Sequence, residues 1–125
     1  MTNNTEANNL YINGMFAFLK EKYRESIDHL SRAIGEDPGH ALAHLSRGSA
    51  FFRSDRLDEA IADFDRAIQL NPQLARSYHL RGLAKERQGN DAGAMTDFEK
   101  AIELDPEYGA AFYSRATLHT KMGNE

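Results

Sequence analysis

Apolar residues between positions 57 and 68 follow a spacing of three, one, three, three and one residues. Because an α-helix has about 3.6 residues per turn, this spacing places them on one helical face. The pattern ends at Asn71 and Pro72, and the residue before a proline disfavours helical backbone, so we expect the helix to stop there. A shorter pattern precedes it and breaks near residues 54–56, which predicts a unit of helix, turn, helix and proline. The apolar positions are Ala43, Gly48, Ala50 and Phe51 in the first helix, and Leu57, Ala60, Ile61, Phe64, Ala67 and Ile68 in the second.

The same unit recurs along the chain with a fixed period, the interval that separates Gly14 from Gly48 and Gly48 from Gly82. A fixed period of this length indicates stacked copies of one supersecondary unit, none of which can bury its apolar face alone. A glycine inside a helix costs about 1 kcal/mol relative to alanine, so three glycines in register indicate a close approach of two helices. The other recurring positions are Ala33, Ala67 and Ala101; Ile34, Ile68 and Ile102; and Pro38, Pro72 and Pro106.

This pattern resembles the tetratricopeptide repeat when the units are numbered from Ala7, Ala41 and Ala75. The family has small residues at positions 8 and 20, a large apolar residue at 24, alanine at 27 and proline at 32. The resemblance implies an all-α fold, a right-handed superhelical stack or α-solenoid. The matching residues at positions 20 and 24 are Ser26, Ala60, Ala94, Leu30, Phe64 and Phe98.

The register divides the chain into five segments. We expect a disordered N-terminal segment at residues 1–6 and repeats at 7–40, 41–74 and 75–108. Residues 109–125 are expected to form a single helix, the first half of a fourth repeat or a capping helix. We predict that Phe112 and Ala116 order this helix against the third repeat, and that Leu118 and Met122 are exposed or covered by another chain.

Composition excludes several classes of function. A net charge of −4 argues against a general nucleic-acid binder or an anionic-membrane binder, and no apolar run approaches the ~20 residues of a membrane span. The chain has no cysteine, and its N-terminus lacks the features of a signal peptide, so we expect a cytoplasmic protein. His40 and His44 have a spacing that can bind zinc, but no third ligand is evident, so we expect neither a metal site nor a cofactor. The sequence contains no nucleophile–base motif and no phosphate-binding motif, so we do not expect an enzyme.

A second apolar stripe follows the first helix of each unit. In the family, positions 2, 5, 9 and 12 of that helix line a concave groove, and their spacing places them on a face distinct from the glycine. Here the stripe is apolar in the first two units and becomes polar and cationic toward the C-terminus. An excess of exposed apolar groups typically marks an interaction site. The candidate groove residues, with neighbouring cations, are Tyr11, Met15, Phe18, Leu42, Leu45, Phe52, Arg53, Arg76, His79, Leu83, Arg87 and Tyr113.

We therefore interpret the chain as a scaffold or adaptor that binds a peptide or helix of a partner protein in this groove. The expected partner is apolar, with an acidic portion that approaches Arg53, Arg76 and Arg87. Two alternatives stay open: tight curvature or residues 1–6 bury the stripe within the chain, or the module forms a homo-oligomer through residues 109–125. Family members that hold a C-terminal carboxylate use a five-residue clamp, of which only Arg76 is matched here. The five positions hold Tyr11, Met15, Ser46, Arg76 and Leu80.

Two charged positions recur with the same period. Arg47 is followed by Asp63, and Arg81 is followed by Asp97 at the same interval. We expect a structural Arg–Asp pair within each of these two units.

Overall fold

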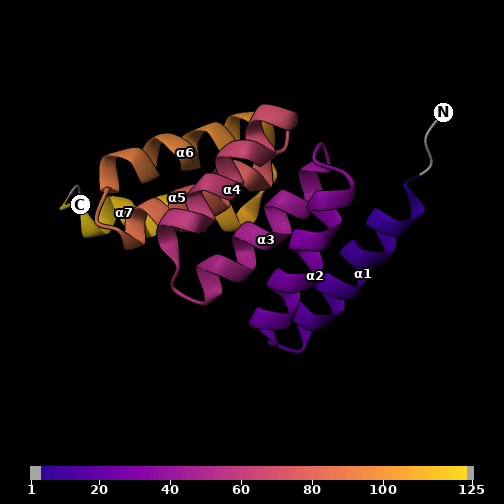
Figure 1. Cartoon of the computed structure of the whole chain (residues 1–125). Helices are drawn as coiled ribbons and strands as arrows, with labels where there is room; N and C mark the ends of the chain where they lie inside the picture. Colours follow the sequence, from indigo (N-terminus) through magenta and orange to yellow (C-terminus); the bar gives the residue numbers. More distant parts are fainter. Residues whose placement is uncertain (1–3, 124–125) are drawn as a thin grey trace.

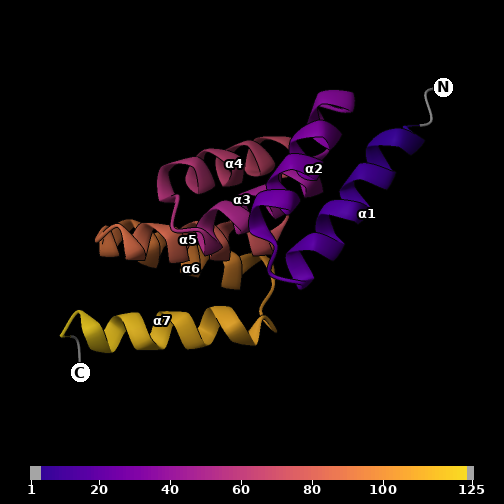
Figure 2. The same cartoon turned by 60° about the horizontal axis from the view of Figure 1, so that its bottom comes forward.

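The computed structural model describes residues 4–123, and this part of the chain consists of helices joined by short turns (Figure 1). Figure 2 shows a curved array with α1 and α7 at its two ends. The expected all-α solenoid is therefore confirmed. The helices are α1 (Thr5–Leu19), α2 (Tyr23–Glu36), α3 (Ala41–Arg53), α4 (Leu57–Leu70), α5 (Ala75–Arg87), α6 (Asp91–Leu104) and α7 (Gly109–Lys121).

The first helix starts earlier than the repeat register indicates. Thr5 and Glu6 already belong to α1, so the expected disorder of residues 1–6 is wrong for these two residues. The side-chain amide of Asn4 donates a hydrogen bond of 3.1 Å to the Glu36 carbonyl, which joins the start of α1 to the end of α2. Residues 1–3 lie outside the described part of the chain.

Each glycine of the period lies where two helices of a pair come closest. A Cβ atom added to Gly48 would lie 2.6 Å from Cε1 of Phe64, and one added to Gly82 would lie 2.6 Å from Cε1 of Phe98. Carbon atoms pack at about 3.5–4.0 Å, so a side chain at these positions would overlap the ring. Both rings are fully buried. The glycines therefore permit a large residue of the second helix to seat directly on the backbone of the first.

The turn inside each pair repeats one backbone geometry. Glu21 and Asp55 have φ of 61°, and Gly89 has φ of 90°, all in the left-handed region. In the second unit the Arg56 amide donates to the Phe51 carbonyl at 2.8 Å, and the Asp55 amide donates to the Phe52 carbonyl at 3.0 Å. These two bonds form a Schellman motif, which satisfies the last carbonyls of the first helix and reverses the chain.

The expected Arg–Asp pairs are confirmed. Arg47 donates from Nε and Nη2 to the carboxylate of Asp63, both at 2.8 Å, and Arg81 makes the same two bonds to Asp97 at 2.9 and 2.8 Å. The remaining nitrogen Nη1 of Arg81 donates to Asp65 at 2.9 Å, on the preceding helix pair. The hydrogen bonds to Asp97 raise the pKa of Arg81 above its usual range. Arg47 likewise donates from Nη1 to the Ser31 hydroxyl at 3.1 Å, so each arginine joins its own second helix to the preceding unit.

The packing of α7 differs from the prediction. Leu118 is fully buried against Ala94 and Phe98 of α6, whereas Phe112 is 38% exposed and Ala116 is exposed. The helix has two apolar faces, and the face that contains Leu118 packs on the preceding pair. The face that contains Phe112 and Ala116 is the one on which, in the other units, a second helix packs. The expectation that Leu118 forms an exposed end is therefore wrong, and with it the basis proposed for self-assembly through that residue.

Candidate peptide-binding face

The C-terminal ends of α1, α3, α5 and α7 form a continuous row. The guanidinium carbon of Arg53 on α3 lies 5.5 Å from the ring centre of Phe18 on α1. The next step repeats this arrangement, with Arg87 on α5 lying 4.3 Å from the ring centre of Phe52 on α3. Two aromatic rings at equivalent positions are thus each covered by an arginine from the following unit. Both distances fall within the range of cation–π contacts.

Further contacts hold these arginines in place. Arg53 donates from Nη1 to the Tyr23 hydroxyl at 3.2 Å, and Tyr23 packs edge-on against Phe18 with ring centres 5.5 Å apart. Arg87 lies 3.9 Å from the Asp55 carboxylate, a long ion pair that leaves its side chain 51% exposed. Because the guanidinium groups remain accessible, their N–H groups are available to a carboxylate from outside.

A hollow of about 270 Å³ opens beside the second arginine. Phe52 and Leu83 provide its apolar wall, and Arg87 provides a cation. Lys121 lies 3.5 Å from the Glu86 carboxylate, so these two charges on the rim largely satisfy each other. The hollow therefore offers an apolar surface next to one accessible guanidinium group.

Other predicted groove residues lie farther from the C-terminal ends of these helices. Tyr11 is half-buried and stacks against His40, with ring centres 4.9 Å apart. Leu42 and Tyr113 are 45% and 72% exposed, and Arg76 is exposed. Met15, which lies between Tyr11 and Phe18 on α1, is half-buried. The apolar stripe is therefore partly buried within the chain, as one alternative predicted, but a substantial part of it faces solvent.

Two predicted groove residues belong to the core instead. Leu45 is only 1% exposed and packs in the cluster that includes Phe64 and Ala84. His79 is 6% exposed, and its ring nitrogens lie 3.0 Å from the Tyr108 hydroxyl and 2.9 Å from the Ser114 hydroxyl. The first helices of successive pairs approach closely, so side chains at this position are enclosed between them. Neither residue presents its side chain to a partner.

The environment of His79 favours the neutral imidazole. Burial lowers the pKa of His79 below its usual range, and the nearby charge of Arg76 lowers it further. A neutral imidazole has one donor and one acceptor nitrogen, and a hydroxyl group can serve either. Burial also raises the pKa of the Tyr108 hydroxyl, which keeps that group protonated.

Sequence reasoning missed a second hollow, of about 490 Å³, next to Arg76. Tyr108 and Leu74 line it together with Leu104 and Asp105. The position of Tyr108 holds His40 and Leu74 in the preceding units, so the period did not single it out.

The histidine pair has structural roles. His40 accepts a hydrogen bond of 3.1 Å from the Ala43 amide through Nδ1, which caps α3. His44 lies 3.5 Å from the Asp63 carboxylate and 3.2 Å from the Pro38 carbonyl. Within residues 4–123 no group of three or more His, Asp or Glu side chains is arranged to hold a metal ion.

Among the helices of this range, none is long and apolar enough to cross a membrane.

Comparisons with known proteins place these features in a family context. Two family models described as tetratricopeptide repeats match residues 19–75 and 75–108. None of the curated proteins compared with the chain matches it. Among solved structures, the first such domain of Spaghetti (RPAP3), bound to the HSP90 peptide SRMEEVD, is 26% identical with a TM-score of 0.93, over 98% of this chain and 97% of that one.

Two other solved structures show the same arrangement. The second tetratricopeptide-repeat domain of human RPAP3, in complex with the HSP70 peptide SGPTIEEVD, is 26% identical with a TM-score of 0.83, over 90% of this chain and 97% of that one. The tetratricopeptide-repeat domain of Arabidopsis OM64 is 21% identical with a TM-score of 0.93, over 96% of this chain and 99% of that one. This likeness supports the fold alone.

Proposed function

Because the chain belongs to the tetratricopeptide repeat family, we propose that it is a protein-interaction adaptor that binds a peptide segment along the face formed by α1, α3 and α5. The apolar side chains of the segment pack on Tyr11, Met15, Phe18, Leu42 and Phe52. An acidic portion of the segment pairs with Arg53, Arg76 and Arg87. The role needs no catalytic step.

The observation that carries this proposal is the repeated aromatic–arginine pair, Phe18 with Arg53 and Phe52 with Arg87. An arginine stacked on an aromatic ring loses little conformational freedom when it binds a carboxylate, because its orientation is already restricted. The ring beneath offers apolar area to the neighbouring side chain of the same ligand. Each pair thus suits a ligand in which an acidic residue lies next to an apolar one.

The peptides bound by the similar RPAP3 domains are acidic near their C-terminus. This likeness supports an acidic peptide as the ligand here. The positions of the carboxylate clamp, however, hold residues of other types in this chain. Tyr11 at one of them is stacked on His40, and Ser46 at another is buried. We therefore propose that this chain recognises an internal acidic and apolar sequence, and that it does not depend on a free C-terminal carboxylate.

Selection from a random peptide library, followed by fluorescence anisotropy of the best peptide, tests the proposal. Phe52→Ala should weaken binding by about 1–4 kcal/mol, the range of interface hot spots. Arg87→Ala should have a smaller effect that decreases with added salt, since exposed charges are screened. The matched control is Phe112→Ala, which removes an exposed phenylalanine outside this face and should leave affinity unchanged.

Two further arms make the result decisive. Amidation of the peptide's C-terminus should leave the affinity unchanged, and the peptide SRMEEVD should bind more weakly than the selected one. Circular dichroism of each variant establishes that the helices remain folded. Equal affinities for wild type and Phe18→Ala/Phe52→Ala, both folded, would place the binding site elsewhere.

A further inference from the structure

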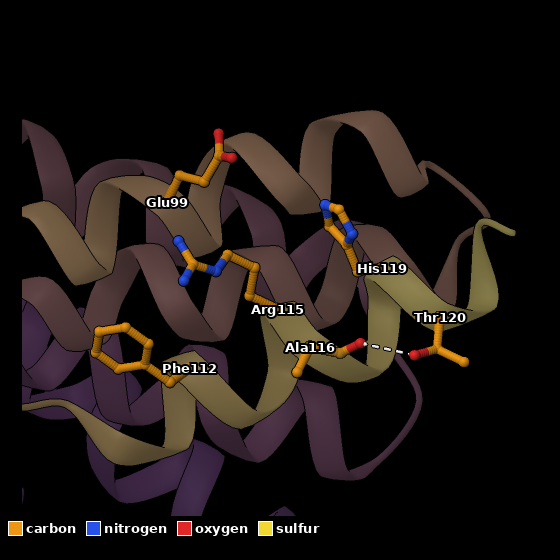
Figure 3. A pocket seen from close by; sticks show the side chains of 6 residues that line it. All are labelled: Glu99, Phe112, Arg115, Ala116, His119 and Thr120. Carbon is orange, nitrogen blue, oxygen red and sulfur yellow. Dashed lines mark hydrogen bonds between the residues drawn. The ribbon is translucent and has the colours of Figure 1, made fainter. Parts of the chain in front are cut away.

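Two hollows of the array differ in how they are bounded. Figure 3 shows Phe112, Arg115 and His119 gathered on one side of α7, where a hollow of about 610 Å³ opens. In the other units a second helix packs on this side of the first, so that hollow is a single helix face. A smaller hollow, of about 250 Å³, lies between the first and second units and is bounded by both. It can therefore be compared with the same junction between the second and third units.

Cationic and polar groups line this inter-unit hollow. Arg24 and Ile27 of α2 form one side of it. Ser54 and Arg56, in the turn between α3 and α4, form the other side. The two guanidinium groups thus come from different units, with a hydroxyl group near the second.

The same junction is closed one repeat period later. The counterparts of Arg24 and Ser54 are Asp58 and Gln88. The side-chain amide of Gln88 donates a hydrogen bond of 2.6 Å to the Asp58 carboxylate, which joins the second and third units directly. Between the first and second units a guanidinium replaces the carboxylate and a short hydroxyl replaces the long amide. This exchange leaves the junction open and reverses its charge.

Arg56 is held in place beside the inter-unit hollow. Its Nε and Nη2 donate to the carboxylate of Glu59 at 2.9 and 2.6 Å, and its guanidinium carbon lies 4.8 Å from the ring centre of Phe51. Its Nη1 has no hydrogen-bond acceptor among the described residues, and the side chain is 51% exposed. Arg56 therefore offers a donor whose orientation is already restricted.

Arg24 and Ser54 are exposed, and their polar groups are available. Within residues 4–123 no carboxylate lies within ion-pair distance of Arg24, although Asp28 follows one turn later on α2. An anion in the inter-unit hollow would receive hydrogen bonds from both arginines and from the Ser54 hydroxyl. It would thereby join the first two units, as Gln88 and Asp58 join the next two.

These donors suit a phosphoryl group better than a carboxylate. A carboxylate has two oxygens in one plane, whereas the donors of the inter-unit hollow approach from two units. A phosphoserine side chain carries a charge of about −1.5 to −2 at pH 7 and three strong acceptor oxygens. The planar fork of arginine matches such a group. The net charge of −4 disfavours a nucleic acid or an anionic membrane as the source of the phosphate.

The inter-unit hollow adjoins the peptide-binding face. Arg53 donates to the Tyr23 hydroxyl at 3.2 Å, and both residues pack against Phe18. Their neighbours in sequence, Ser54 and Arg24, line the hollow. Consecutive Cα atoms are about 3.8 Å apart, so one short peptide segment can reach both Phe18 and the hollow.

We propose that the inter-unit hollow binds a phosphoserine or phosphothreonine side chain of the bound peptide. The phosphorylated residue lies within about three residues of the apolar residue that packs on Phe18. Arg24 and Nη1 of Arg56 pair with the phosphoryl oxygens, and the Ser54 hydroxyl donates to one of them. This inference rests on the proposed peptide-binding function and adds regulation to it, because phosphorylation of the partner raises its affinity.

The probe is a peptide library with phosphoserine at the central position and random flanking residues. The best phosphopeptide selected on the wild-type chain is compared with its serine form in anisotropy titrations. Arg24→Gln removes one cation from the inter-unit hollow, and Ser54→Asp introduces a carboxylate there. The matched control is Arg32→Gln, which removes the same charge from an exposed position about two turns further along α2.

The expected result is a phosphate preference that depends on the inter-unit hollow. The phosphopeptide should bind wild type about tenfold more tightly than its serine form, since charge-assisted hydrogen bonds are the strong ones. Arg24→Gln and Ser54→Asp should bring this ratio close to one, and Arg32→Gln should leave it unchanged. Circular dichroism establishes that each variant is folded.

Phe18→Ala/Phe52→Ala separates this inference from the proposed function. The variant should weaken binding of both peptide forms equally and keep their ratio, because it alters the face and leaves the hollow intact. Unchanged affinities of both forms for this variant would contradict the proposed function, while the loss of the ratio in Arg24→Gln would still assign the phosphoryl group to the hollow.

Equal affinities of the phosphorylated and serine forms for wild type would overturn the proposal. So would a preference that Arg24→Gln leaves unchanged, or one that Arg32→Gln removes equally, which would indicate general electrostatic attraction. Inorganic phosphate alone should compete only at concentrations far above the dissociation constant of the phosphopeptide. Competition as effective as that of the phosphopeptide would assign the hollow to a free anion.

Discussion

Replacing Gly48 by alanine tests the close approach on which the helix pairs depend. The added Cβ would lie 2.6 and 2.8 Å from two atoms of the Phe64 ring and 3.1 Å from Cβ of Asp63. Normal carbon contacts are about 3.5–4.0 Å, so the ring or the helix has to move by about 1 Å. Phe64 is fully buried, and Asp63 is fixed by two hydrogen bonds to Arg47, so neither can move without disturbing other contacts.

The expected magnitude is a balance of opposing effects. Alanine is favoured over glycine in a helix by about 1 kcal/mol. Overpacking a well-filled core costs about 1–3 kcal/mol. We therefore expect Gly48→Ala to lower the free energy of unfolding by up to about 2 kcal/mol, despite its better helix propensity.

Gly35 provides the matched control. It is the penultimate residue of α2, and a Cβ added there would meet nothing within 4 Å. Gly35→Ala should therefore raise the free energy of unfolding by up to about 1 kcal/mol. The assay is urea denaturation followed by circular dichroism, with equal m-values required for the comparison. If Gly48→Ala proved as stable as Gly35→Ala, the reasoning about close approach would be refuted.

Four further substitutions probe the backbone and the core. Ser77 has a buried hydroxyl without a hydrogen-bond partner among the described residues, so Ser77→Ala should stabilise the fold by about 0.5–2 kcal/mol in the same assay. A loss of stability would contradict this, because it would mean that the hydroxyl makes a hydrogen bond. Glu21 has a left-handed backbone, so Glu21→Gly should stabilise by about 0.5–1 kcal/mol while Gly89→Ala should destabilise, and effects of equal sign would contradict this account. Because burial holds the pKa of His79 below the unfolded value of about 6.5, the unfolded chain takes up the proton first as pH falls. Stability should therefore decrease below about pH 6.5, and His79→Gln should reduce that decrease; an unchanged pH profile would contradict the cause given.

The fold could be predicted closely because its determinants repeat. Gly48 and Phe64, and likewise Arg47 and Asp63, recur one period later, so a contact required in one unit was expected in the next. The turn residues could be placed but not their backbone geometry, since Glu21 is not a residue type that favours a left-handed conformation.

The site was less predictable because burial depends on neighbouring units. The spacing of Leu45 and His79 assigns them to the groove stripe, yet the approach of adjacent first helices encloses both. Leu118 and Phe112 lie on two apolar faces of α7, and periodicity alone does not tell which face the preceding pair covers. The stacking of Arg87 on Phe52 joins residues of adjacent units, a relation that the pattern within one unit does not contain.

The most direct test of the central claim is a map of backbone amide chemical shifts during titration with the library-selected peptide. The account predicts that the largest changes fall in α1, α3 and α5, above all near Phe18, Phe52 and Arg87, and that they are lost in Phe18→Ala/Phe52→Ala. Largest changes in α2, α4 and α6, or around Arg115 on α7, would contradict it.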